Sequence, residues 1–153
     1  MMNYETRLKE LKIELPEAPK SVGSYTPVVI QGTTAYLSGQ VSKYGTARFI
    51  QGRIGKDLTL EQGQEAARLA ALNVISLIRS AIGFDKLDRI LRVVGYVNAD
   101  PSFYEIPQVV NGASDLLVLL FQDQGIHARS SVGVASLPMN AAVEIEVTLQ
   151  LKA

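Results

Sequence analysis

The sequence predicts an α+β protein, in which one β-sheet carries two helices on one of its faces. Residues 59–82 and 106–122 place apolar side chains at helical spacing. Residues 27–40 and 128–151 are each typical of a hairpin, and residues 143–151 alternate apolar and polar side chains, as in a strand with one buried face. Residues 88–98 form a near-continuous apolar run that suits a strand covered on both faces. Together these segments give the order ββαβαββ, an α+β layer.

The first element expected is a short amphipathic helix over about residues 4–12, in which Leu8 and Leu11 share one side. The prolines within residues 16–19 stop it. Residues 27–30 and 34–40 flank the turn Gln31-Gly32-Thr33, and we expect them to pair as a hairpin. Residues 41–58 are rich in glycine and charge, and they predict a long loop.

Thr59 begins the strongest helical pattern in the chain. Thr59 and Gln62 have the spacing of a capping box, in which each side chain accepts a hydrogen bond from the other's backbone N–H. Gly83 follows the last apolar position and suits a helix C-cap. The side expected to face the core consists of Ala67, Ala70, Ala71, Val74, Ile78 and Ile82.

A strand over residues 88–98 and a second helix over residues 106–122 follow, and Gly125 is the expected stop of that helix. Its inward side chains are expected to be Val109, Val110, Ala113, Leu116, Leu117 and Leu120. If both helices lie on one face of the sheet, the other face has no cover within the chain. We expect further copies of the protein to bury it.

The last segment, residues 128–151, is expected to close the sheet as a hairpin. Alternation over residues 143–151 puts Glu144 and Glu146 together on the side away from the core, where a charge needs solvent, a partner or a function. If Gly133 lies opposite Glu144, Arg129 starts roughly 13 Å away, at about 3.3 Å per residue. An extended arginine recovers about half of that distance. The two charged groups would then flank a molecule of a few heavy atoms.

Composition narrows the classes of function. With 153 residues, of which 47% are hydrophobic, the chain suits one domain, residues 1–153, with an ample core. Lys+Arg and Asp+Glu balance at 15 each, so no strong field attracts nucleic acid. The absence of cysteine excludes disulfides and a thiol nucleophile. Neither a secretory signal nor a membrane span is recognisable, and we expect a cytoplasmic protein.

Sequence motifs for cofactors are missing. The chain has no phosphate-binding loop of the G-x-x-x-x-G-K-S/T type and no dinucleotide fingerprint, so we expect no cofactor. His127 is the single histidine. We therefore expect no metal site and no acid–base role for His127.

Three motifs resemble the RidA/YjgF family of enamine/imine deaminases. Residues 128–138, ARSSVGVASLP, followed by residues 143–146, VEIE, are similar to the family's C-terminal signature. Residues 22–25 resemble its Gly-Pro-Tyr entry, and residues 37–41 resemble its S/T-G-Q turn. The match covers most of the chain from about residue 20 and is poor over residues 43–62. The chain looks like a divergent member, similar to the chorismate-mutase-like "putative endoribonuclease L-PSP" branch.

The resemblance implies a chorismate-mutase-like fold with one mixed sheet, assembled as a homotrimer with clefts between subunits. It implies that Arg129 binds the carboxylate of the substrate and that Glu144 activates water. Arginine suits the first role because its guanidinium forms two parallel bonds to a carboxylate, and glutamate suits the second as a proton acceptor. The resemblance places four more residues at the substrate: Tyr25, Gly39, Asn111 and Ser131.

The leading hypothesis is therefore cofactor-independent hydrolytic deamination of reactive enamines or imines, such as 2-aminoacrylate, to 2-keto acids and ammonia. One alternative is a non-catalytic trimeric module that binds small carboxylates or acts like a chaperone. Another is an endoribonuclease, which the neutral charge and single histidine disfavour. Structural interpretations also stay open: Arg129 and Glu144 could pair across a subunit contact, and Ser38 with Gly39 could simply form a bulge.

Overall fold

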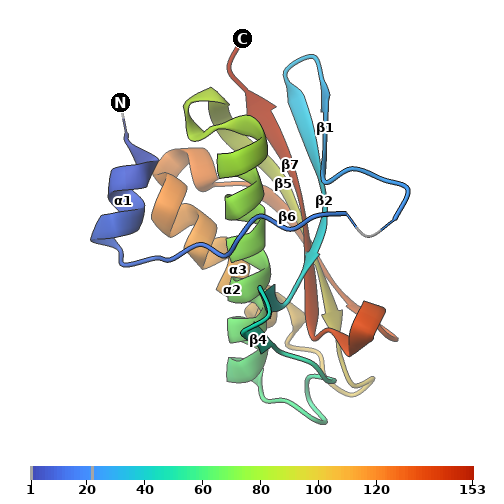
Figure 1. The fold of residues 1–153 in the computed structure, drawn as a ribbon. Coiled ribbons are helices and arrows are strands. Elements are labelled where there is room, and N and C mark those ends of the chain that lie inside the picture. Colours follow the sequence, from blue (N-terminus) through green and yellow to red (C-terminus); the bar gives the residue numbers. More distant parts are fainter. Residues whose placement is uncertain (1, 22) are drawn as a thin grey trace.

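The computed structural model describes residues 2–21 and 23–153, so Met1 and Val22, the first residue of the motif at 22–25, lie outside the described part. Its main sheet is mixed and has five strands in the order β1-β2-β7-β5-β6 (Figure 1). The strands are Val28–Gln31 (β1), Thr34–Val41 (β2), Leu87–Asn98 (β5), Ala128–Val134 (β6) and Val143–Leu151 (β7). Both long helices lie on one face of this sheet, which confirms the predicted α+β class (Figure 1).

The two long helices are α2, Leu60–Leu77, and α3, Ile106–Phe121. The predicted capping box starts α2: Gln62 N donates to Thr59 Oγ1 at 3.2 Å, and Thr59 N donates to Gln62 Oε1 at 2.8 Å. A π-turn continues α2 to Gly83, whose φ of +98° lies in the region that favours glycine. Every apolar side chain predicted for the inner sides of the two helices is buried.

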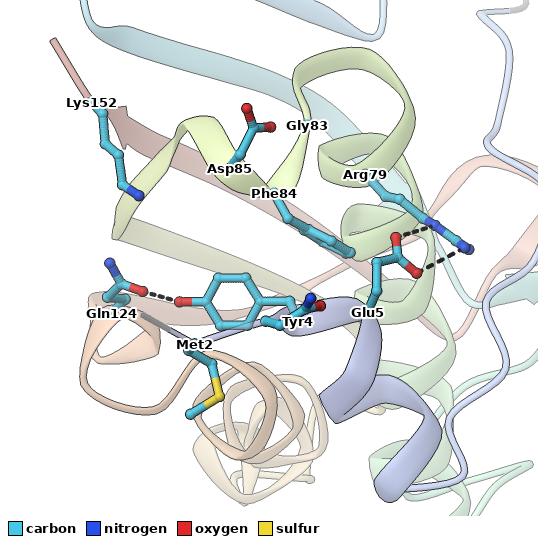
Figure 2. Close-up of a pocket in the computed structure, with 10 residues that line it drawn as sticks. Met2, Tyr4, Glu5, Arg79, Gly83, Phe84, Asp85, Gln124 and Lys152 are labelled. Carbon is cyan, nitrogen blue, oxygen red and sulfur yellow. Dashed lines mark hydrogen bonds and ion pairs between the residues drawn. The ribbon is translucent and has the colours of Figure 1, made fainter.

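The short helix α1, Tyr4–Glu10, packs against the end of α3. The Tyr4 ring meets the rings of Phe84 and Phe121 edge-on. Figure 2 shows the Tyr4 hydroxyl bonded to Gln124. Arg7 adds two hydrogen bonds to the carbonyl oxygen of Leu119. The predicted N-terminal helix is therefore confirmed, and polar and aromatic contacts fix it in place.

The closing hairpin predicted for residues 128–151 is wrong. Strand β5 lies between β6 and β7, pairing in parallel with β6 and antiparallel with β7. Helix α3 carries the chain back along the sheet between β5 and β6, so these two strands run in the same direction, as in a βαβ unit. β6 is consequently an edge strand, and a short 3-10 turn, Pro138–Asn140, helps to carry the chain across to β7.

The segment expected as a long loop, residues 41–58, holds a small hairpin of its own. Its strands are Lys43–Tyr44 (β3) and Arg48–Phe49 (β4). The Asn73 side chain on α2 donates to the carbonyl oxygens of Val41 and Lys43, which ties the start of this hairpin to the helix. The prediction missed it because each strand is only two residues long, too short for alternation to register.

The sheet has two different faces. On β7, alternate side chains from Val143 to Leu151 are buried under the helices, while those between them are only half-buried. On the open face, Val29 of β1 pairs with Tyr36 of β2, and both side chains are about half exposed. Neither α2 nor α3 covers this face (Figure 1). None of the helices in the described chain is both long and apolar enough to cross a bilayer.

Candidate functional site

Three of the six predicted site residues line one cleft. Tyr25, Gly39 and Glu144 border a cavity of about 520 Å³ beside the end of β2. The cleft is also lined by residues 17–21 and by the β3–β4 hairpin, which lies in the segment that resembles the family poorly. The charged residues on its wall, apart from Glu144, are Glu17, Lys20 and Lys43.

A β-bulge shapes this cleft. Leu37 pairs with Val147 and Gln40 pairs with Ile145, so Ser38 and Gly39 together face one residue of β7. The bulge anticipated as a structural interpretation of Ser38 and Gly39 is thus present. Ser38 holds the segment after Tyr25, because its Oγ donates to the carbonyl of Thr26 at 2.8 Å and its N–H donates to that of Pro27 at 2.8 Å.

Gly39 leaves room for the Glu144 carboxylate. A Cβ atom at position 39 would lie 2.5 Å from Glu144 Oε2 and 2.9 Å from its Cδ, closer than side-chain atoms approach one another. The carboxylate therefore lies directly over the glycine backbone. A side chain at position 39 would force it to move.

The Glu144 carboxylate is partly desolvated. Burial raises its pKa above the ordinary glutamate value, and the nearby negative charge of Glu146 raises it further. Glu146 itself accepts a 2.7 Å hydrogen bond from the Tyr96 hydroxyl, and that bond is the main reason that the pKa of Tyr96 is raised. No side chain of the described chain donates a hydrogen bond to Glu144. Its position suits a proton acceptor that faces a ligand or water.

The other predicted residues lie at the β6 edge of the sheet, against α3. Arg129 donates from Nη1 to Asn111 Oδ1 at 2.8 Å and to Ser114 Oγ at 3.1 Å, and from Nη2 to the carbonyl of Pro107 at 3.4 Å. The three acceptors recur at helical spacing, so they share one side of α3. All three are uncharged, which leaves the positive charge of Arg129 without an anion in the described chain.

Ser131 and His127 flank Arg129 on the same side of the strand. Side chains two residues apart in a strand share a face. The hydroxyl oxygen of Ser131 is buried and has no hydrogen-bond partner among the described residues. His127 lies 2.6 Å through Nδ1 from the carbonyl oxygen of Gly125 and 2.9 Å through Nε2 from Ser114 Oγ.

Arg129 and Glu144 do not converge within one chain, which corrects the expectation that they flank one small molecule on a hairpin. Glu144 is level with Tyr96 and Val132 on the open face. Arg129 is level with Val93 and with the buried Val147, on the helix face. The two positions are also roughly 10 Å apart across the sheet, which is two strand spacings, and roughly 10 Å apart along the strands, which is three residues.

Two residues that contact this group were missed or dismissed. Ser114 follows Asn111 by three positions, which is enough to place both on one side of a helix. His127, Arg129 and Ser131 alternate, which is enough to place them on one face of a strand. Both signals were present in the sequence, but the hairpin interpretation gave no reason to connect them.

A second cavity, of about 530 Å³, lies between α1 and the end of α2, where none of the six predicted residues is found (Figure 2). Its charged side chains include Glu5 and Arg79, which pair with each other at 2.8 Å. In the part of the chain that the structure describes, no three His, Cys, Asp or Glu residues are grouped to hold a metal ion.

The fold and these residues define a member of a known class. The chain belongs to the family described as YjgF/chorismate mutase-like, putative endoribonuclease, whose model matches residues 5–150. It is 40% identical over 146 residues to Protein TCP17 of Trypanosoma cruzi, covering 94% of this chain and 91% of that one. It is 31% identical over 135 residues to a 2-iminobutanoate/2-iminopropanoate deaminase of Dermatophagoides farinae, covering 88% and 91%.

A solved structure agrees over the whole length. A putative endoribonuclease from Shewanella oneidensis MR-1 is 34% identical and superposes with a TM-score of 0.92, covering 98% of this chain and 100% of that one. The family resemblance found in the motifs is therefore confirmed, and the names of the relatives include both a deaminase and an endoribonuclease.

Proposed function

We propose that the protein hydrolyses reactive enamine and imine intermediates of the 2-aminoacrylate type to 2-keto acids and ammonia. The observation that carries the proposal is the Arg129 guanidinium, held by uncharged acceptors and left without an anion. Such a group suits a carboxylate ligand, because arginine forms paired, charge-assisted bonds to it. The relative named as a 2-iminobutanoate/2-iminopropanoate deaminase supports the reaction type.

The chemistry needs one carboxylate and one water molecule. Glu144 accepts a proton from water as the water oxygen bonds to the C=N carbon, and it returns that proton to the nitrogen to form a carbinolamine. Glu144 then takes the proton of the carbinolamine hydroxyl and gives it to the nitrogen, so the C=O bond of the keto acid forms as the C–N bond breaks and ammonia leaves. The raised pKa of Glu144 helps this step, because a proton carrier works best when its pKa approaches the working pH.

The reaction requires that the cleft and the Arg129 group come from different copies of the protein. In one chain they lie on opposite faces of the sheet. β6 is an edge strand and the open face is not covered by the long helices, so another copy can approach at both places. We propose a homotrimer in which the Glu144 cleft of one subunit meets the Arg129 edge of the next.

Ammonia release tests the proposal. A 2-imino acid is generated in place by an amino-acid oxidase or a threonine dehydratase, and its hydrolysis is followed with the wild-type protein and with Arg129→Ala. We expect the wild type to accelerate release and the variant to lose most of that acceleration. Equal rates from the two proteins would contradict the role of Arg129.

The same variants separate catalysis from binding alone. Glu144→Gln is expected to keep affinity for pyruvate, the product of 2-aminoacrylate hydrolysis, while turnover is lost. If the wild type binds pyruvate but never accelerates hydrolysis, the protein is a carboxylate-binding module instead. Salt-sensitive binding of single-stranded RNA by the pure protein would favour the endoribonuclease interpretation.

A further inference from the structure

The only histidine of the sequence is connected to Arg129 through one serine hydroxyl. His127 Nδ1 lies 2.6 Å from the carbonyl oxygen of Gly125, and Nε2 lies 2.9 Å from Ser114 Oγ. Ser114 Oγ also receives the 3.1 Å hydrogen bond from Arg129 Nη1. The result is a continuous chain of hydrogen bonds from the backbone after α3 to the guanidinium.

The direction of every bond in this chain is fixed by its two ends. A carbonyl oxygen only accepts, so the proton on the imidazole belongs on Nδ1, facing Gly125. A guanidinium only donates, so Ser114 Oγ accepts from Arg129. The serine hydrogen is then left to point at Nε2 of His127, which in the neutral ring is an acceptor.

We propose that His127 and Ser114 are positioning residues that hold Arg129 for carboxylate binding, with His127 in the Nδ1–H tautomer. The inference rests on the proposed function only in assigning the carboxylate to Arg129. Asn111 and Ser114 engage both hydrogens of Nη1. The ligand carboxylate therefore binds side-on, to Nε–H and Nη2–H, the part of the fork that has only the long 3.4 Å contact with Pro107.

The surroundings of His127 keep the ring neutral, as this arrangement requires. Burial is the main cause that lowers its pKa, and the positive charge of Arg129 lowers it further, against the opposing effect of the bond to Gly125. The opposite tautomer would point two acceptors, Nδ1 and the carbonyl oxygen, at each other across 2.6 Å.

The tautomer is measured first, without any ligand. Long-range proton–nitrogen NMR correlation of the imidazole identifies the protonated nitrogen, and the single histidine removes any ambiguity of assignment. At neutral pH we expect the proton on Nδ1. A ring protonated only on Nε2 would overturn the proposal, whatever the protein's activity.

Binding of pyruvate to the full-length protein then tests the positioning. Ser114→Ala removes the hydroxyl and is expected to weaken pyruvate binding about tenfold, because Arg129 then loses one charge-assisted hydrogen bond that holds it in place. Ser114→Thr keeps a hydroxyl and is expected to restore most of the affinity. Ser80→Ala, in the π-turn that follows α2, serves as the control and is expected to bind like the wild type.

The outcomes separate this inference from the proposed function. If Arg129→Ala binds pyruvate as well as the wild type, the assignment of the carboxylate to Arg129 fails. If Arg129→Ala abolishes binding but Ser114→Ala does not change it, the carboxylate site stands and the positioning role is overturned. Loss of affinity in Ser114→Ala that Ser114→Thr restores, together with the Nδ1–H tautomer, supports the proposal.

Discussion

The cleft at Glu144 and the edge at Arg129 differ in how their charged groups are held. The Glu144 carboxylate has no hydrogen-bond donor in the described chain, lies over a glycine and is partly desolvated. The Arg129 guanidinium is fixed by three uncharged acceptors on α3. Under the proposed function, one region offers a proton acceptor and the other an anion site. Because the two lie on opposite faces of one chain, the proposal joins them between copies.

The largest expected effect comes from removing the carboxylate of Glu144. Glu144→Gln removes the proton acceptor but keeps the shape of the side chain, and turnover is expected to fall on the order of 100-fold or more. The rate of ammonia release measures it. Glu146→Gln is the matched control two residues along the same face, and its rate is expected to stay within a few-fold of the wild type. An equal loss of turnover in both variants would show that the negative charge of this face, rather than Glu144 in particular, supports the reaction.

A smaller effect is expected from the glycine beneath the carboxylate. In Gly39→Ala the new methyl group would overlap Glu144 Oε2, so the carboxylate must move and kcat is expected to fall about tenfold. Gly133→Ala on β6 is the control, because its Cβ would lie 3.4 Å from the nearest atom, an ordinary contact. Unchanged kcat in Gly39→Ala, with the fold intact, would place the chemistry away from Glu144.

The substitution Arg129→Lys tests whether the second region needs a guanidinium and not only a positive charge. Lysine keeps the charge but has no planar fork, so it cannot hold a carboxylate side-on while it bonds to α3. We expect KM to rise several-fold to about tenfold, with a smaller change in kcat. Steady-state kinetics measures both constants. A variant in which kcat falls while KM is unchanged would assign Arg129 a role in the chemical step instead.

The sequence predicted the elements well because their signals are local. The capping box at Thr59 and the apolar sides of both long helices depend only on near neighbours along the chain. The pairing of β6 was not predictable in this way, because β5 reaches its place between β6 and β7 through α3. The assumed register put Gly133 level with Glu144, whereas Val132 holds that place. A shift of one residue moves every side chain of a strand to the other face.

That shift explains which parts of the candidate site could be predicted. Residue types and motifs located the two charged groups, and the bulge at Ser38 and Gly39 was anticipated as a structural alternative. The opposite faces of Arg129 and Glu144 depend on the register between strands, which no local pattern records. The connection from His127 to Arg129 depends on a helix and a strand meeting, and it became visible only in the structure.

The smallest expected effect is on stability, and its sign differs between the two regions. The pKa of Glu144 is raised, so its stabilising contribution is present below its ordinary pKa of 4.5 and is lost as pH rises through the higher folded value. The pKa of His127 is lowered, so its contribution is present above its ordinary pKa of 6.5 and is lost as pH falls through the lower folded value.

Urea unfolding across this pH range measures both contributions. Glu144→Gln is expected to gain stability over the wild type as pH rises above 4.5, because the variant has no desolvated charge. The wild type is expected to lose free energy of unfolding as pH falls below 6.5, and His127→Phe is expected to lack that contribution to the loss. Parallel pH profiles for the wild type and Glu144→Gln would contradict the desolvation of that carboxylate.

The central claim, that each site joins Arg129 of one copy to Glu144 of another, is tested most directly by mixing two inactive variants. Arg129→Ala and Glu144→Gln are co-expressed with different tags, and the mixed trimers are purified and assayed for ammonia release. Each mixed trimer holds two copies of one variant and one of the other, so one of its three sites joins an intact Arg129 to an intact Glu144. Activity near one third of the wild type is therefore expected. Mixed trimers that stay as inactive as either variant alone would contradict the shared site.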